Sequence, residues 1–178
     1  QGNKIWRHCV SEDLIHWSDQ GCGLKPEEWY EKNGCYSGSG ITEGDSYYLF
    51  YTGNVRDSEG GRETYQCLAS SSDGVNFHKE GPVVYLPEGY TPHFRDPKVW
   101  KENGKYYMVV GSRHSDGSGQ IALFCAESPE KWEFAGILDR SENKIGRMWE
   151  CPDFYPLDGK QVLMISPQEM EAEGLEFH

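Results

Sequence analysis

The 178-residue sequence has no long apolar run, since no stretch approaches the roughly 18 residues that a membrane-spanning helix needs. Residues 1–4 show no apolar segment of the kind that a signal peptide contains. Basic residues are also scarce, because 17 lysines and arginines face 29 acidic residues and leave a net charge of −12. A nucleic-acid partner needs a basic face. We therefore expect no nucleic-acid partner and no membrane partner.

Paired cysteine motifs are missing as well. The six cysteines form no Cys-x-x-Cys pair, which argues against a zinc ribbon or a thioredoxin-like site. The six histidines show no metal-ligand spacing, so we expect no metal and no other cofactor. Most cysteines lie in apolar, strand-like segments, such as Cys67 in the run 65–69. We interpret them as free, buried thiols in a reducing compartment, and we expect a cytoplasmic protein.

Short runs of aromatic and β-branched residues are what the sequence does contain, each bounded by Gly, Asp, Asn or Ser. Aromatic residues make up 13% of the chain, which is enough to build a core. No segment predicts a long helix, so we expect an all-β protein. The runs are 47–52, 65–70, 105–110, 120–125 and 161–165.

Two patterns recur at nearly the same interval. Ser-x-Asp followed four positions later by an aromatic residue occurs at 11–17 and again 60 residues later at 71–77. Tyr-Tyr-Leu-Phe at 47–50 recurs 59 residues later as Tyr-Tyr-Met-Val at 106–109. A period near 59 residues suits a four-stranded propeller blade, so the chain should hold about three blades. A sandwich of hairpins with chance similarity is the alternative.

A strongly polar segment opens each repeat, where the inner strand of a blade should line the central channel. These segments contain Ser37, Asp96 and Glu150, at separations of 59 and 54 residues. Blade symmetry therefore predicts that the three side chains meet in one axial pocket. Two carboxylates beside an arginine suit a glycosidase, which needs one carboxylic acid for the leaving oxygen and a second carboxylate as nucleophile or base.

The neighbouring residues predict different protonation states, and so different roles, for the two carboxylates. Glu150 is the better acid candidate, because Trp149 and Cys151 flank it and burial favours the protonated form. Asp96 follows Arg95, which we expect to hold it ionised, ready to accept hydrogen bonds from sugar hydroxyls. Arg95 also offers a planar set of donors. An isolated Arg-Asp-Pro is more often a structural ion pair, and the repeat spacing is what favours function.

Four segments in this order make the sequence similar to glycoside hydrolase family 32, which contains invertases, sucrose-6-phosphate hydrolases and other β-fructofuranosidases. Residues 6–17 resemble the family's Trp-x-His-Ala-x-Ser-x-Asp-Leu-x-x-Trp segment, and residues 34–39 its Gly-Cys-Phe-Ser-Gly-Ser segment. Residues 94–97 contain its Arg-Asp-Pro motif, and residues 149–152 its Glu-Cys motif. The resemblance implies a five-bladed β-propeller, with a double-displacement reaction that retains configuration at terminal β-fructofuranosides.

The resemblance also implies roles for individual residues. Glu150 would be the general acid/base, and Asp96 would stabilise the transition state by bonding fructosyl hydroxyls. Cys151 would lie behind Glu150. The expected partner is a small sugar: sucrose, sucrose 6-phosphate or a fructan. The substrate-binding residues would be Arg95, Tyr36, Ser37 and Cys151. The arginines that could contact a substrate phosphate, which the sequence does not rank, are Arg56, Arg62, Arg113 and Arg147.

One family segment does not occur in these residues. The family nucleophile is an aspartate in a Trp-x-Asn-Asp-Pro-Asn-Gly segment, and one blade period before Ser37 falls before residue 1. We therefore expect residues 1–178 to form a partial catalytic propeller domain, without the nucleophile segment, the last blades and a C-terminal β-sandwich, and to be inactive alone. The alternatives are a related propeller glycosidase acting on arabinosides or xylosides, and a propeller that binds carbohydrate without catalysis.

Overall fold

The computed structural model describes residues 3–142 and 144–174, where twelve β-strands and one short 3-10 turn make up the regular structure. Within each sheet, every strand pairs antiparallel with the strand next to it in sequence. The all-β prediction is confirmed. In the described part of the chain, no helix is long and apolar enough to cross a membrane.

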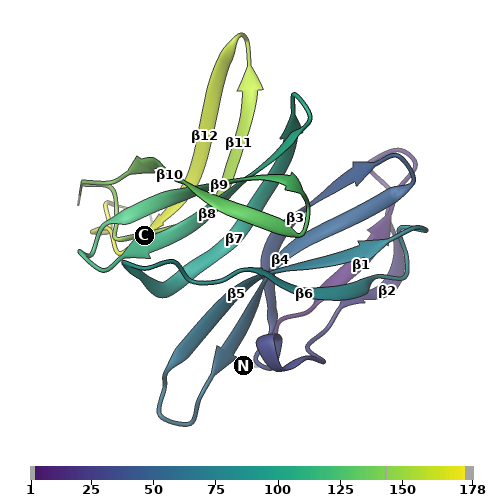
Figure 1. Ribbon diagram of the computed structural model, residues 1–178, viewed down its shortest axis with the longest axis horizontal. Helices are drawn as coiled ribbons and strands as arrows, with labels where there is room; N and C mark the ends of the chain where they lie inside the picture. The colour runs from purple at the N-terminus through teal and green to yellow at the C-terminus, as the bar shows by residue number, and fades with distance from the viewer. Residues whose placement is uncertain (1–2, 143, 175–178) are drawn as a thin grey trace.

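Two four-stranded sheets form the centre of the molecule, and a two-stranded sheet flanks each of them (Figure 1). The first central sheet contains β3 (Cys35–Glu43), β4 (Ser46–Arg56), β5 (Arg62–Ser71) and β6 (His78–Val84). The second contains β7 (Tyr90–Glu102), β8 (Lys105–His114), β9 (Gly119–Ser128) and β10 (Lys131–Arg140). The flanking pairs are β1 (Trp6–Val10) with β2 (Ser18–Leu24), and β11 (Met148–Leu157) with β12 (Lys160–Gln168). The 3-10 turn, η1, is Trp29–Glu31.

The described strands amount to three blades, as the repeat predicted, but they are divided differently from three consecutive complete blades. The turn at 11–17 joins β1 to β2, and its repeat at 71–77 joins β5 to β6. In both turns the aspartate accepts two backbone N–H bonds, at 2.9 and 2.7 Å for Asp13 and at 2.8 and 2.8 Å for Asp73. β1 and β2 therefore correspond to the third and fourth strands of a blade, and β11 and β12 to the first and second.

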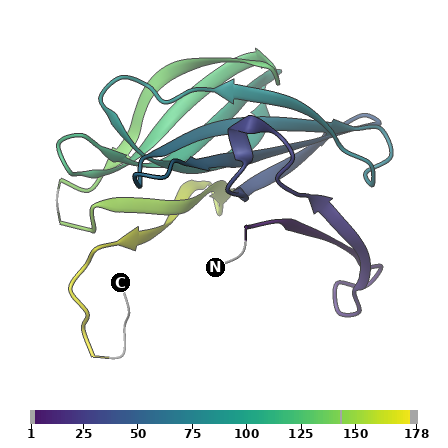
Figure 2. The same cartoon turned by 90° about the horizontal axis from the view of Figure 1, so that it is seen from below.

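An apolar core fills each contact between neighbouring sheets, as in a propeller. The largest core lies between the two central sheets and includes Phe50, Phe94 and Met108, none of which is exposed. A second core joins the β1–β2 pair to the first central sheet, and a third packs Trp149 of β11 against the second. In Figure 2 both flanking pairs lie below the two central sheets, the β1–β2 pair toward the right and the β11–β12 pair toward the left. The inner strands β3, β7 and β11 thus come from three successive sheets.

The cysteines agree with only part of the expectation. All six are free thiols, and Cys35 and Cys67 are buried as predicted. The prediction of burial is wrong for Cys9, Cys22 and Cys151, which are exposed. The physical reason for the first two is their position on the β1–β2 pair, where only Leu24 is buried.

Candidate active site

Each of the three inner strands carries a β-bulge at the same end of the sheet. The register breaks between Tyr36 and Gly38 in β3, between Arg95 and Lys98 in β7, and between Glu150 and Asp153 in β11. A bulge bends its strand and redirects the side chains beside it. The polar segments singled out in the sequence are therefore the places where the inner strands turn their side chains toward the axis.

The bulges also define which positions of β7 and β11 correspond. Asp96 and Cys151 both adopt a positive φ, 67° and 46°, and a proline follows each of them. The structural equivalents are thus Arg95 with Glu150 and Asp96 with Cys151. The predicted convergence of the polar segments is confirmed, although the sequence argument matched Asp96 to Glu150, one position away from its true counterpart.

A cavity of about 430 Å³ lies where these bulges meet. All six residues predicted for the site line it, together with four others. The lining residues are Lys4, Tyr36, Ser37, Arg62, His93, Arg95, Asp96, Glu150, Cys151 and Gln168.

The Glu150 carboxyl group is held from two sides. Arg95 Nε donates to Glu150 Oε1 at 2.8 Å, and Arg95 Nη2 lies 2.6 Å from the same oxygen. Gln168 of β12 donates through Nε2 to Glu150 Oε2. Arg95 Nη2 also donates to Gln168 Oε1 at 3.3 Å. Because the Arg95 side chain is only 7% exposed, this arrangement fixes the orientation of Glu150 at the pocket wall.

Asp96 is bound mainly by the backbone of the neighbouring bulge. It is 6% exposed, and its Oδ2 accepts the N–H of Cys151 at 2.9 Å. Arg95 Nε is 4.0 Å from Asp96 Oδ2, because the guanidinium points to Glu150 instead. Burial raises the pKa of Asp96, while the Cys151 N–H bond and Arg95 lower it and nearby Glu150 raises it further. Arg95 thus favours the ionised form of Asp96, as predicted, while burial opposes it and sets the direction of the pKa shift.

A buried polar chain on the adjacent sheet supports the bulge at Asp96. The N–H of Asp96 donates to Thr52 Oγ1 at 2.9 Å, and the Thr52 hydroxyl donates to Gln66 Oε1 at 2.7 Å. Gln66 Nε2 then donates to the carbonyl of Phe94 at 3.1 Å. Thr52 and Gln66 are fully buried, so β4 and β5 hold the backbone of β7 on both sides of Arg95.

The remaining predicted residues lie at the same pocket. The thiol of Cys151 is 3.6 Å from Asp96 Oδ2, so Cys151 contacts Asp96. Desolvation and the charges of Asp96 and Glu150 raise the pKa of Cys151 to about 11, which keeps the thiol protonated near neutral pH. Ser37 is exposed at the wall, and the Tyr36 carbonyl accepts the indole N–H of Trp6 at 2.9 Å.

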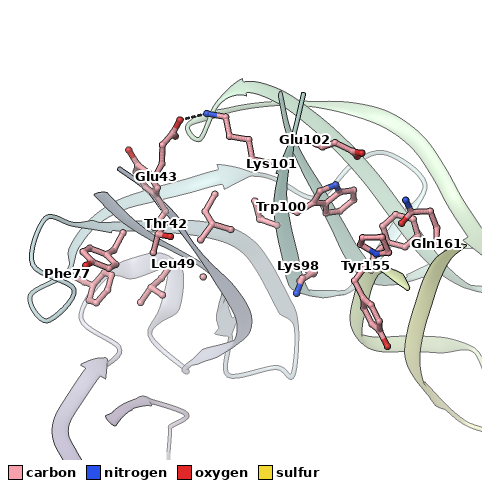
Figure 3. A pocket seen from close by; sticks show the side chains of 17 residues that line it. Thr42, Glu43, Leu49, Phe77, Lys98, Trp100, Lys101, Glu102, Tyr155 and Gln161 are labelled. Carbon is pink, nitrogen blue, oxygen red and sulfur yellow. Dashed lines mark hydrogen bonds and ion pairs between the residues drawn. The ribbon is translucent and has the colours of Figure 1, made fainter. Parts of the chain in front are cut away.

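A larger cavity, of about 840 Å³, lies at the opposite ends of the same inner strands (Figure 3). Thr42 and Glu43 of β3, Trp100 and Lys101 of β7 and Tyr155 of β11 line it. Its wall is largely aromatic and aliphatic, and Lys101 pairs with Glu43 at its edge. None of the catalytic candidates lies there, so the smaller cavity is the candidate active site.

Sequence reasoning missed three residues of the pocket: Lys4, His93 and Gln168. Gln168 has a readable signal, because the Asp158–Gly159 turn folds β12 back along β11 and brings 168 level with Met148. His93 precedes Arg95 by two positions, which places both on one face of a strand. Lys4 reaches the pocket through an isolated bridge to Gly34, for which the sequence carries no local signal.

The fold and the pocket together define a propeller domain whose axial site presents paired carboxylates and an arginine, the residue set of a carbohydrate-cleaving enzyme. The profile of the Glycosyl hydrolases family 32 N-terminal domain matches residues 1–177. The chain belongs to this family.

Relatives and solved structures support the same family assignment. The chain is 49% identical to the sucrose-6-phosphate hydrolase of Bacillus subtilis over 99% of its own length and 38% of that protein. It superposes on sucrose-6-phosphate hydrolase from Lactobacillus gasseri with a TM-score of 0.87 and 33% identity, covering 94% of this chain and 35% of the other. A Bombyx mori beta-fructofuranosidase variant in complex with sucrose gives a TM-score of 0.85 and 39% identity, covering 96% and 36%. The chain thus spans little more than a third of these proteins.

Proposed function

We propose that this chain supplies the acid/base and the fructosyl-binding residues of a retaining β-fructofuranosidase that hydrolyses sucrose or its phosphorylated form. The observation that best supports this proposal is the position of the Glu150 carboxyl group, which Arg95 and Gln168 fix beside the buried Asp96 in one axial cavity. The names of the Bacillus subtilis and Bombyx mori relatives support this choice of substrate over arabinosides and xylosides.

Glu150 acts first as an acid. In its protonated form it gives its proton to the glycosidic oxygen while the bond from that oxygen to the fructosyl anomeric carbon breaks. That carbon forms a bond to a carboxylate nucleophile, a role that the family resemblance gives to an aspartate outside these 178 residues. Glu150, now ionised, takes a proton from water as the water attacks the same carbon and releases fructose.

Asp96 and Arg95 serve this reaction by position. The described residues leave Asp96 Oδ1 without a hydrogen bond, so this oxygen can accept a hydrogen bond from a fructosyl hydroxyl. Such bonds strengthen as positive charge develops on the sugar ring in the transition state. Arg95 keeps the Glu150 carboxyl group at the pocket wall through both proton transfers.

The test uses the longest reading frame that contains this chain. We expect Glu150→Gln to lower the turnover of sucrose and of sucrose 6-phosphate by about 10²–10⁴-fold, the contribution typical of general acid catalysis. For an aryl β-fructofuranoside with a nitrophenolate leaving group, kcat/KM should fall much less, because that group departs without a proton. Its kcat should still fall, because Glu150 is also the base that activates the attacking water. The matched control is Glu127→Gln, because the Glu127 side chain of β9 is exposed, and this variant should keep the parent turnover. Equal turnover by Glu150→Gln and the parent would contradict the proposal, and sugar binding without turnover would favour a carbohydrate-binding propeller.

A further inference from the structure

Two cationic side chains that pair with no acid among the described residues, Arg62 and Lys4, line the pocket, although the whole chain carries a net charge of −12. Arg95 pairs with Glu150, and Arg113 pairs with Glu169 at 2.8 Å. Arg62 also lines the pocket, but its side chain forms no hydrogen bond or ion pair with any residue in 3–142 or 144–174. An unpaired, partly buried guanidinium in an acidic protein requires a physical explanation.

Arg62 faces a second arginine across the sheet. It opens β5 directly opposite Arg56 on β4, and like charges facing each other across antiparallel strands destabilise a sheet. Thr64 and Gln66 follow on the same face of β5 and bond the carbonyls of Pro92 and Phe94 in β7. Arg62 therefore continues this row toward the pocket. Burial and the charges of Arg56 and Arg95 lower the pKa of Arg62, and the smaller opposing effects of Tyr36 and Glu150 do not offset them, so an added negative charge beside Arg62 would be favourable.

His93 adds a second donor at the same place. Its Nδ1 lies 3.3 Å from Arg95 Nη1, and because a guanidinium nitrogen only donates, this ring nitrogen accepts. Burial and the charges of Arg95 and Arg62 lower the pKa of His93, which favours the neutral ring with its proton on Nε2. Lys4, which is exposed, lines the same cavity and pairs with no acid in the described part of the chain. Arg62, His93 and Lys4 thus offer donors of three kinds and no acceptor.

We propose that Arg62, assisted by Lys4 and His93, binds the phosphate monoester of the leaving sugar and so selects sucrose 6-phosphate over sucrose. This inference rests on the proposed function. Glu150 and Asp96 occupy the part of the pocket where the fructosyl bond breaks, so an anion held by Arg62 belongs to the other sugar. The planar fork of a guanidinium matches two phosphate oxygens.

The structure also ranks the arginines that the sequence left unranked. Arg113 is neutralised by Glu169, while Arg56 and Arg147 do not line the pocket. Arg62 is the arginine that combines pocket access with an unpaired charge. Arg56 contributes through its field on Arg62, and we assign it no direct contact.

The experiment compares kcat/KM for sucrose 6-phosphate with kcat/KM for sucrose in the longest protein that contains this chain. We expect Arg62→Gln to lower the ratio of the two values by about 10–100-fold, the loss of one or two charge-assisted hydrogen bonds. Arg62→Lys should give an intermediate ratio, because it keeps the charge but loses the fork. Arg140→Gln, on an exposed arginine paired with Asp116, should keep the parent ratio. A parent-like ratio in Arg62→Gln would overturn the inference.

A binding measurement separates this inference from the proposed function. Calorimetric titration with glucose 6-phosphate and with glucose requires no turnover. Preference for glucose 6-phosphate that Arg62→Gln abolishes supports the subsite, even if neither sucrose nor its phosphate is cleaved. In that case only the proposed function fails. If the protein cleaves sucrose but binds glucose 6-phosphate and glucose equally well, the phosphate subsite is contradicted and the proposed function still holds.

Discussion

Two residues at the centre of the site are held in states that cost free energy. Cys151 takes a left-handed backbone conformation, which costs a non-glycine residue about 1 kcal/mol or more. Asp96 takes a similar conformation, which an aspartate tolerates better, but it brings a carboxyl group to 6% exposure. The surrounding sheets hold both, through Thr52 on one side and the Cys151 N–H on the other.

The raised pKa of Asp96 determines how this residue changes the stability of the protein with pH. The ordinary value is 3.8, and burial places the folded-state value above it. Below pH 3.8 the carboxyl group is protonated in both the folded and the unfolded protein, so it imposes no penalty. The penalty grows as the pH rises through the interval between the two pKa values, and above the folded-state value it is complete.

We therefore expect Asp96→Asn to raise the melting temperature at pH 7, with a difference from the parent that shrinks as the pH falls toward 3.8. An asparagine still accepts the Cys151 N–H and tolerates the positive φ. The same variant should lose about 10²–10³-fold in kcat, as when one transition-state hydrogen-bonding group is removed. Thermal melts at several pH values and fructose release check both. Asp45→Asn in the exposed β3–β4 turn is the control, and a lower melting temperature for Asp96→Asn at pH 7 would refute the argument.

The neighbouring strands approach the site through glycines that leave no room for a side chain. Gly111 of β8 lies opposite Arg95 in the register. A Cβ atom at Gly111 would lie 2.2 Å from the carbonyl oxygen of Trp149 and 3.3 Å from that of Arg95. Both atoms are backbone, so neither can move without shifting a strand. Gly111 thus sets how close β11 comes to β7, and with it the contact between Arg95 and Glu150.

We expect Gly111→Ala to lower the free energy of unfolding by about 1–3 kcal/mol, the usual cost of overpacking. It should also move Glu150 away from Arg95 and reduce kcat. Gly23→Ala is the matched control, because the nearest atoms to its added Cβ lie at 3.7 Å, an ordinary contact. Denaturant unfolding and a crystal structure of each variant measure the two effects. Equal unfolding free energies for the two alanine variants would contradict this prediction, because β11 would then move away from β8 at little cost.

Much of this architecture could be predicted from the sequence, because the repeated turns share a local sequence pattern and the same hydrogen bonds. The Ser-x-Asp turns at 11–17 and 71–77 form the same hydrogen bonds, and their spacing located the polar segments on the inner strands. The sequence could not show that Arg95 turns to Glu150 and leaves Asp96 without a close ion pair, because a strand from another sheet decides it. The exposure of Cys9 was missed for a related reason, since it depends on what covers a sheet face.

Across the whole molecule, stability should follow how much each strand pair buries. β4 and β8 each contain at least four buried residues in a row, whereas β1 contains none and β2 only Leu24. β11 and β12 are intermediate, because Met148 and Trp149 are buried. Backbone hydrogen bonds open where few apolar contacts must break. A pair of strands without further packing is marginal in water.

Native-state hydrogen exchange of the chain, followed by mass spectrometry or NMR, should therefore resolve three classes of amide. We expect the β1–β2 amides to exchange fastest, those of β11–β12 at intermediate rates, and those of β4 and β8 near the rate of global unfolding. β11–β12 is the internal control, because it is also a two-stranded sheet and differs from β1–β2 mainly in burial. Equal protection of the two pairs would mean that strand number, and not the apolar contact with the central sheets, limits opening. Slower exchange in β11–β12 would instead show that the packing of Trp149 stabilises the strand that carries Glu150.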